Sequence, residues 1–126
     1  MHRVLLVDDS QTTRSYAMAT LEAQGDMDVT VAKSGLEALK ILPQGDFDLL
    51  ISDVNMPDIN GLELIRFARA HERYKETPII MISTEGRDTD ISRALALGAN
   101  QFLVKPFSPE SLVKAARDYL PELGDE

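Results

Sequence analysis

Side chains that could take part in chemistry follow four apolar runs of this sequence, each at the point where the run ends. Asp8 and Asp9 follow Val4–Val7, Asp53 follows Leu49–Ile51 and Ser52, Ser83 and Thr84 follow Ile79–Ile82, and Lys105 follows Phe102–Val104. If these runs are parallel strands of one sheet, their carboxyl ends meet at one edge, where ligands bind in such sheets. The sequence therefore predicts that three carboxylates, a hydroxyl and an ammonium group come together.

The charges of these side chains indicate what they bind. Two like charges about 4 Å apart repel by about 4 kcal/mol at an effective dielectric constant of about 20. Three crowded aspartates must therefore raise their own pKa values or recruit a cation. With Lys105 counted, two negative charges remain, and a divalent ion would balance them. Because all the ligands are oxygens, a hard cation such as Mg²⁺ is favoured over zinc.

A metal-bound carboxylate beside a hydroxyl and a lysine suits phosphoryl transfer. That reaction needs an in-line nucleophile, and positive charge or hydrogen-bond donors on the phosphoryl oxygens. Asp53 is the predicted nucleophile and would form an acyl phosphate. Mg²⁺ and Lys105 would neutralise the oxygens, and the Ser83 hydroxyl would donate a hydrogen bond to one of them.

The elements that must position this site are five apolar runs in alternation with five helical patterns. A weaker strand is predicted at Val29–Ala32, and helices at Gln11–Ala23, Gly35–Leu42, Gly61–Ala70, Asp88–Leu97 and from Pro109 onward. Ser10 and Ser108 are candidate N-caps. Pro43 is expected to end the second helix, and Gly98 to cap the fourth. Continuous apolar strands separated by helices indicate a doubly wound parallel α/β sheet covered on both faces.

The composition excludes several classes of protein. A chain of 126 residues is long enough for one domain with its own core. No stretch approaches the ~18 apolar residues that a membrane span needs. A net charge of −8 opposes binding to nucleic acid, and the lack of cysteine fits a reducing compartment. We therefore expect a cytoplasmic protein that binds neither membranes nor nucleic acid.

These landmarks, taken in order, resemble the receiver domain of two-component signalling, and most of all the single-domain chemotaxis regulators of CheY type. The landmarks are Asp8-Asp9, Asp53 with Asn55-Met56-Pro57 and Gly61, Ser83-Thr84, and Lys105-Pro106-Phe107. The resemblance covers essentially the whole chain. It implies a flavodoxin-like three-layer sandwich, for which we expect strand order 2-1-3-4-5, the order that flavodoxin and the chemotaxis receiver share.

The resemblance also implies a role for each landmark. Asp53 resembles the phosphoacceptor, which receives its phosphoryl group from a histidine kinase. The ligands of Mg²⁺ or Mn²⁺ would be Asp8, Asp9, Asp53 and the Asn55 carbonyl. Ser83 and Lys105 stand at the switch hydroxyl and the phosphate-binding lysine. Phe102 stands at the switch aromatic, where chemotaxis members usually carry Tyr. The Lys105–Pro106 bond is expected to be cis, and Asn55 and Glu85 to give a short-lived phosphoryl group.

In this interpretation residues 1–126 form a single receiver domain with no output domain, a monomer that signals rather than an enzyme. The signal would leave through the face made by helix 4, strand 5 and helix 5, including Arg93, Phe102 and Lys114, toward a protein target in chemotaxis or motility. A phosphotransfer-relay receiver and a receiver fragment of a larger regulator remain alternatives.

Three competing functions make different predictions. An aspartyl-phosphate phosphatase would need a general acid two residues after its nucleophile, where this chain has Asn55. A flavodoxin-like module would hold a flavin phosphate near Ser10, but Asp8 and Asp9 would repel that phosphate. A degenerate receiver that only binds partners would be expected to lack some of the carboxylates or Lys105. Taken singly, Asp8-Asp9 could be a solvated turn and Ser83 a helix cap.

Overall fold

The computed structural model describes residues 1–84, 86 and 88–123. Five parallel strands form one sheet in the order β2-β1-β3-β4-β5, so the expected order 2-1-3-4-5 is confirmed. The strands are β1 (His2–Val7), β2 (Met27–Ala32), β3 (Leu49–Asp53), β4 (Ile79–Ser83) and β5 (Gln101–Val104). The strand order reverses between β1 and β3, and the carboxyl ends of these two strands therefore flank the expected binding position.

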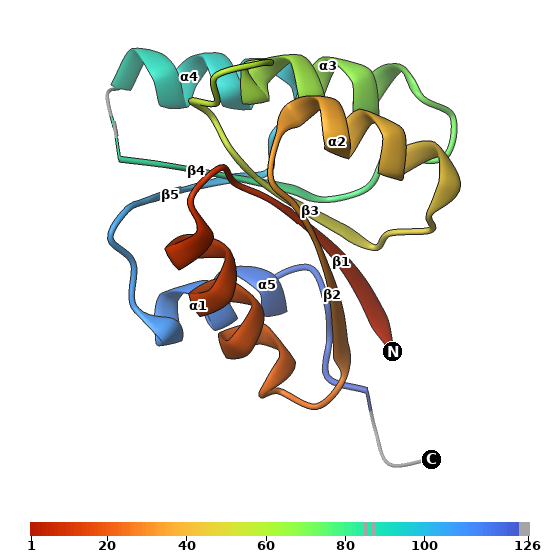
Figure 1. Cartoon of the computed structure of the whole chain (residues 1–126), viewed down its shortest axis with the longest axis vertical. Coiled ribbons are helices and arrows are strands. Elements are labelled where there is room, and N and C mark those ends of the chain that lie inside the picture. The colour runs from red at the N-terminus through yellow and green to blue at the C-terminus, as the bar shows by residue number, and fades with distance from the viewer. Residues whose placement is uncertain (85, 87, 124–126) are drawn as a thin grey trace.

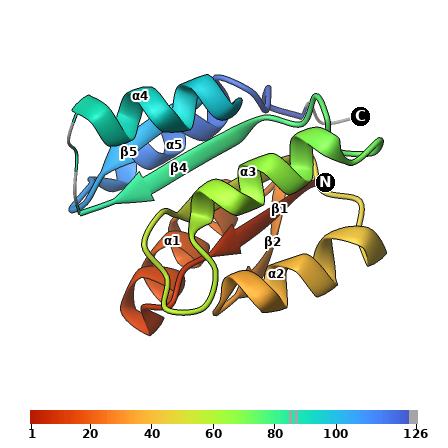
Figure 2. The ribbon, with the colours of Figure 1, turned by 90° about the horizontal axis from the view of Figure 1, so that it is seen from above.

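Helices cover both faces of the sheet, which gives the predicted three-layer sandwich. In Figure 1, α2, α3 and α4 lie above the sheet and α1 and α5 below it. The helices are α1 (Gln11–Glu22), α2 (Gly35–Ile41), α3 (Gly61–Ala70), α4 (Asp88–Leu97) and α5 (Pro109–Arg117). Seen from above in Figure 2, the strands run nearly alongside the helices, as expected when each helix returns the chain to the start of the next strand.

The two faces of the sheet form two separate cores because alternate side chains of each strand point to opposite sides. In β1, Leu5 and Val7 pack under α2 and α3, whereas Val4 and Leu6 pack against α1 and α5. All four side chains are fully buried. This double burial explains why the strands appear in the sequence as continuous apolar runs.

The helix ends follow the predicted signals. Ser10 and Ser108 cap α1 and α5, each accepting a hydrogen bond from a main-chain amide three residues on, and Gly98 has a positive φ after α4. The prediction that Pro43 ends the second helix is confirmed, with the last helical residue one position before the expected Leu42. α2 ends at Ile41, and Pro43 lies inside the following 3₁₀ turn (Leu42–Gln44), at a position where its missing N–H leaves no bond unmade.

The edge of the sheet opposite the strand carboxyl ends is held by two side chains that the sequence did not indicate. The Arg69 guanidinium, at the end of α3, donates to the main-chain oxygens of Gly98 at 2.7 Å and Thr77 at 2.7 Å. The buried Tyr74 hydroxyl lies 2.6 Å from the carbonyl oxygen of Leu42 and 2.9 Å from that of Gly45. Four main-chain oxygens at this edge thus accept side-chain hydrogen bonds.

Candidate functional site

Asp8, Asp9 and Asp53 come together at the carboxyl ends of β1 and β3, as predicted. Each offers one carboxylate oxygen, and these oxygens lie within 4.8 Å of one another. Asp8 is completely buried and Asp53 is 6% exposed, whereas Asp9 faces solvent. Two of the three charges are therefore withdrawn from water, which makes the cluster costly unless a cation compensates it.

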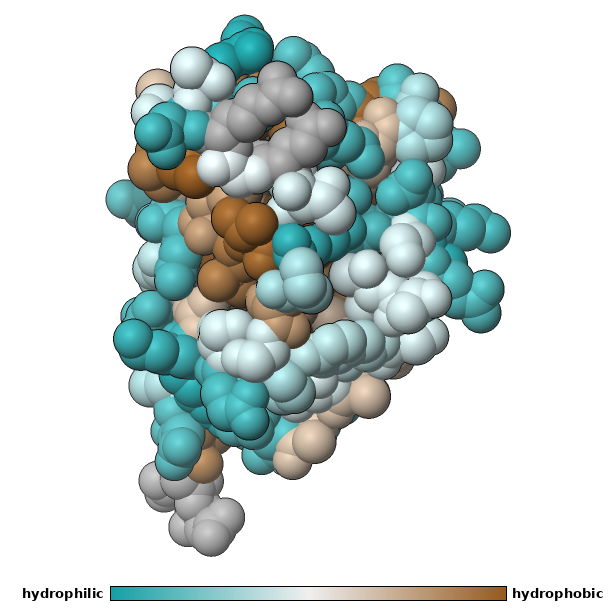
Figure 3. Space-filling view, turned by 90° about the vertical axis from the view of Figure 1, so that its left-hand side faces the viewer, coloured by the Kyte–Doolittle hydropathy of each residue, from teal (hydrophilic) through white to brown (hydrophobic). Residues whose placement is uncertain are grey.

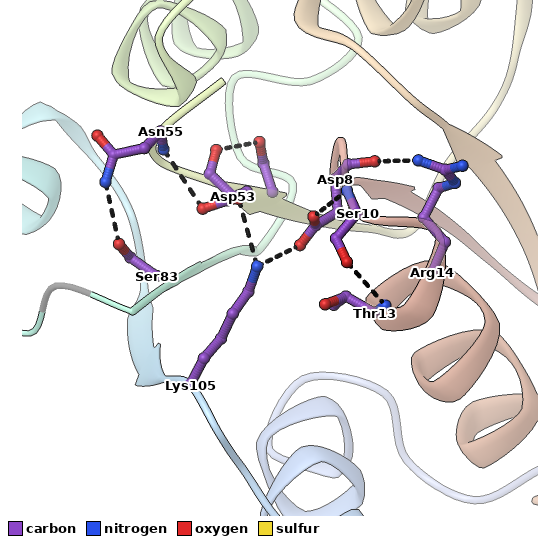
Figure 4. A network of polar contacts seen from close by, with 9 residues as sticks. Asp8, Ser10, Thr13, Arg14, Asp53, Asn55, Ser83 and Lys105 are labelled. Atoms are coloured by element: carbon purple, nitrogen blue, oxygen red, sulfur yellow. Dashed lines mark hydrogen bonds and ion pairs between the residues drawn. The ribbon is translucent and has the colours of Figure 1, made fainter. Parts of the chain in front are cut away.

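Lys105 supplies part of that compensation. Its Nζ lies 2.7 Å from Asp8 Oδ2 and 3.3 Å from Asp53 Oδ2, between the two buried carboxylates. Figure 4 shows the lysine reaching up from the end of β5 to this position. The remaining oxygens are held by the main chain, because the Ser10 amide donates to Asp8 Oδ1 at 2.8 Å and the Asn55 amide to Asp53 Oδ1 at 3.3 Å.

The environment changes the proton affinity of both partners. Burial raises the pKa of Asp53, the Lys105 ammonium opposes this rise, and the charge of Asp8 adds to it, so the pKa stays above the ordinary aspartate value. Burial alone would lower the pKa of Lys105, but Asp8 and Asp53 outweigh it and raise that pKa. The lysine is therefore firmly cationic at neutral pH, and the Asp53 carboxylate gains by pairing with a cation or by losing its charge.

The predicted hydroxyl lies on the other side of Asp53. Ser83 ends β4 and is buried, and the Asn55 side-chain amide donates to its Oγ at 3.3 Å. Thr84, the next residue, is exposed. Asn55 thus joins the segment that follows Asp53 to the end of the neighbouring strand, as seen at the left of Figure 4.

The remaining predicted residues are found as follows. Phe102 lies on β5, half-buried, and packs against the core under α3 and α4. The peptide bond between Lys105 and Pro106 is cis, as the resemblance implies. Glu85, to which a role in the lifetime of the phosphoryl group was assigned, lies outside the described residues.

Two further contacts shape the site and were missed at the level of sequence. The Arg14 guanidinium on α1 donates to the main-chain oxygen of Asp8 at 2.7 Å. Gly61 begins α3 so close to Asp53 that a Cβ atom there would lie 2.1 Å from the Asp53 main-chain oxygen. Gly61 was noted as a landmark, but only the structure gives its reason: a side chain would push the acceptor strand out of place.

The donor set fits a hard divalent cation. Asp8 Oδ2 is buried and accepts no hydrogen bond from the described residues, with only the ion pair to Lys105 beside it. The groups that converge are carboxylate oxygens, without sulfur or imidazole, which is the preference of Mg²⁺ and Mn²⁺ rather than of zinc. A divalent ion would also offset the charge that Lys105 leaves uncompensated.

Comparison with known proteins gives the family. The pattern of the response regulator receiver domain matches residues 4–117, which is most of the chain. The chain belongs to the response regulator receiver domain family. Members of this family are response regulators of two-component systems, and such receiver domains are signalling domains rather than classical enzymes.

Named relatives of this receiver domain are chemotaxis proteins. A chemotaxis protein CheY homolog of Campylobacter jejuni is 43% identical over 94% of this chain and 92% of its own length. Chemotaxis protein CheY1 of Helicobacter pylori is 46% identical over 87% of this chain and 90% of its own length. The solved structure of Vibrio cholerae CheY4 superposes with a TM-score of 0.90 at 41% identity, covering 95% of this chain and 99% of that one. The flavodoxin-like fold is therefore confirmed.

Figure 3 turns the left-hand side of Figure 1, where β4 and β5 meet the loops that follow them, toward the viewer. Apolar side chains gather there in one patch surrounded by polar ones.

None of the helices in the described part of the chain is long and apolar enough to cross a bilayer.

Proposed function

We propose that this receiver domain is a phosphorylation switch in which Asp53 accepts a phosphoryl group from the phosphohistidine of a histidine kinase. The observation that carries the proposal is the position of Asp53, buried beside Asp8 with Lys105 Nζ between the two carboxylates and 3.3 Å from Asp53 Oδ2. An oxygen of Asp53 would attack phosphorus, the bond between phosphorus and the donor nitrogen would break, and the electron pair would stay on that nitrogen. The product is an acyl phosphate on Asp53.

The surrounding residues would stabilise the charge that moves during this transfer. Asp8, Asp9, Asp53 and the main-chain carbonyl of Asn55 would hold Mg²⁺, or Mn²⁺ in its place. When bound, the metal neutralises phosphoryl oxygens and draws the donor to the acidic cluster. The Lys105 ammonium would pair with one phosphoryl oxygen, and the Ser83 hydroxyl would donate to another.

The phosphoryl group would then change the surface through Ser83 and Phe102. A hydroxyl that pairs with a phosphoryl oxygen moves toward Asp53, and space opens for the half-buried Phe102 ring to turn inward. The two arrangements would be populated according to how well each contacts the phosphoryl group. Asn55 and Glu85, which follow Asp53 and Ser83 by two residues each in the sequence, would admit water to the acyl phosphate and keep the signal short-lived.

The partner surface proposed for this switch is the face of α4, β5 and α5, including Arg93, Phe102 and Lys114. Leu95 of α4 and Val104 of β5 are 46% and 45% exposed, so these two elements offer apolar contacts to a partner. We propose that it binds a protein target in chemotaxis or motility, because the named relatives are chemotaxis proteins. The domain would act as a cytoplasmic monomer that spans residues 1–126.

Intact-mass measurement tests this function directly. The wild-type chain, incubated with acetyl phosphate and Mg²⁺, should gain the mass of one phosphoryl group, and EDTA should prevent the gain. Asp53→Asn should gain none. Asp28→Asn, which removes an exposed aspartate of β2, is the matched control and should react like the wild type. Phosphorylation of Asp53→Asn at the wild-type rate would disprove the assignment of the acceptor.

A further inference from the structure

Tyr16 connects α1 to the segment that carries Lys105. The Tyr16 hydroxyl donates to the main-chain oxygen of Phe107 at 3.0 Å, across 91 residues of sequence. The two rings lie with their centroids 5.9 Å apart, tilted by 48°. Tyr16 is 37% exposed, so this contact is made at the surface of the site and not in the core.

Within the described part of the chain, few other hydrogen bonds hold the segment of residues 105–108. The segment begins with the Lys105 amide, which donates to the Ser83 oxygen at 2.8 Å, and ends at Ser108, the N-cap of α5. Between these points Pro106 has no N–H. Of the hydrogen bonds recorded among the described residues, the one from Tyr16 is what holds Pro106–Phe107 from the side.

A cavity makes that lateral contact important. A volume of about 260 Å³ lies between α1 and the segment, lined by Thr12, Thr13, Tyr16, Thr84, Lys105, Pro106 and Phe107. Close packing does not fix the segment against α1 there, and a side chain has to bridge the space. Tyr16 is that bridge, because its ring and its hydroxyl both contact Phe107.

We propose that Tyr16 is a positioning residue for Lys105 in the phosphoryl transfer, a role that rests on the proposed function. Lys105 Nζ must stay between Asp8 and Asp53, at the 2.7 Å and 3.3 Å contacts described above. Its main chain is tethered on one side by Ser83, and Tyr16 tethers the chain two residues further on. Displacements of about 1 Å at a reacting centre are enough to slow a reaction substantially.

Tyr16→Phe tests the hydroxyl while leaving the ring on Phe107. The rate of phosphorylation by acetyl phosphate in saturating Mg²⁺ should fall by about three- to tenfold, the range that one lost hydrogen bond supports. Tyr119→Phe is the matched control, because the Tyr119 hydroxyl also donates to a main-chain oxygen, that of Asn100 at 3.2 Å. It should keep the wild-type rate, and thermal melts should show that both variants fold.

A double-mutant cycle separates positioning from a general loss of structure. If Tyr16 acts through Lys105, then Tyr16→Phe should cause no further loss in a Lys105→Met background. An equal loss in both backgrounds, or a wild-type rate for Tyr16→Phe, would overturn the proposal. Amide signals of Lys105, Phe107 and Ser108 should also shift in Tyr16→Phe and stay unchanged in Tyr119→Phe. If the wild type accepts no phosphoryl group, the proposed function itself fails, and this inference fails with it.

Discussion

Replacing Asp53 by asparagine is expected to make the metal-free protein more stable near neutral pH. At the 4.8 Å that bounds the separations in the acidic cluster, two like charges repel by about 3.5 kcal/mol at an effective dielectric constant of about 20. Asp53 thus meets about 7 kcal/mol of repulsion from its two neighbours, and Lys105 at 3.3 Å returns about 5 kcal/mol. Asparagine removes the balance of about 2 kcal/mol, or about 1–2 kcal/mol once solvent screens the exposed Asp9.

Thermal unfolding in EDTA measures this difference. For a chain of this size 1 kcal/mol corresponds to about 3–5 °C in Tm, so Asp53→Asn should melt about 3–10 °C above the wild type. Asp28→Asn makes the same change in net charge at an exposed position of β2 and should melt within about 2 °C of the wild type. Added salt should narrow the gap between Asp53→Asn and the wild type, since part of the repulsion reaches solvent.

The pH dependence gives an independent check on the cause. Because the pKa of folded Asp53 is raised above 3.8, protonation of this group favours the folded state. Its contribution is complete below the unfolded value and is lost as pH rises through the folded pKa. The gap between variant and wild type should therefore be widest near pH 7 and close as the pH falls toward 4. An Asp53→Asn variant no more stable than the wild type at pH 7 would refute the electrostatic reasoning.

Three more substitutions test the supports of the site. Gly61→Ala should cost about 1–3 kcal/mol of unfolding free energy in urea and slow phosphorylation, because its Cβ would lie 2.1 Å from the Asp53 main-chain oxygen; wild-type values for both would contradict the packing described. Arg69→Gln should cost about 2–4 kcal/mol, since several main-chain oxygens lose their charged donor, and a loss below about 1 kcal/mol would mean that water replaces it. The Asp58 carboxylate accepts hydrogen bonds from the amides of Leu36 and Gly35 at the start of α2, and these bonds, that of Leu36 foremost, lower the pKa of Asp58 to about 2. The stabilisation of the fold by this carboxylate is therefore present above pH 3.8 and lost as pH falls through about 2. An NMR titration that places the midpoint of Asp58 near 4 would contradict these hydrogen bonds to the start of α2.

The site could be predicted because it depends on strand ends and charge. Asp8, Asp53 and Lys105 each follow an apolar run, and in a parallel sheet those ends converge whatever the details of packing. The same reasoning gave the strand order only with the help of the family resemblance. The roles assigned to Ser83 and Phe102 stay predictions, since they concern a change between two arrangements and one arrangement is described.

The contacts that the sequence did not reveal share a physical reason. Arg14, Tyr16, Arg69 and Tyr74 all bond to main-chain oxygens. Every residue type offers such an oxygen, so the acceptor leaves no signal in the sequence, and the pairing depends on how distant elements pack. The 3₁₀ turn after α2 was also not predicted: Pro43 stops the α-helix, but a proline is tolerated in the first turn of the 3₁₀ segment that follows.

The two ends of the strands differ in how they are stabilised. At the amino ends Arg69 and Tyr74 donate hydrogen bonds to main-chain oxygens, whereas like charges crowd at the carboxyl ends. Hydrogen exchange should report this as a gradient along single strands, because local opening follows local stability. Amides at the beginning of β3 and β4 would exchange slowly, and those at their ends faster. The part of the protein best suited to respond to a bound group would then be the part that opens most readily.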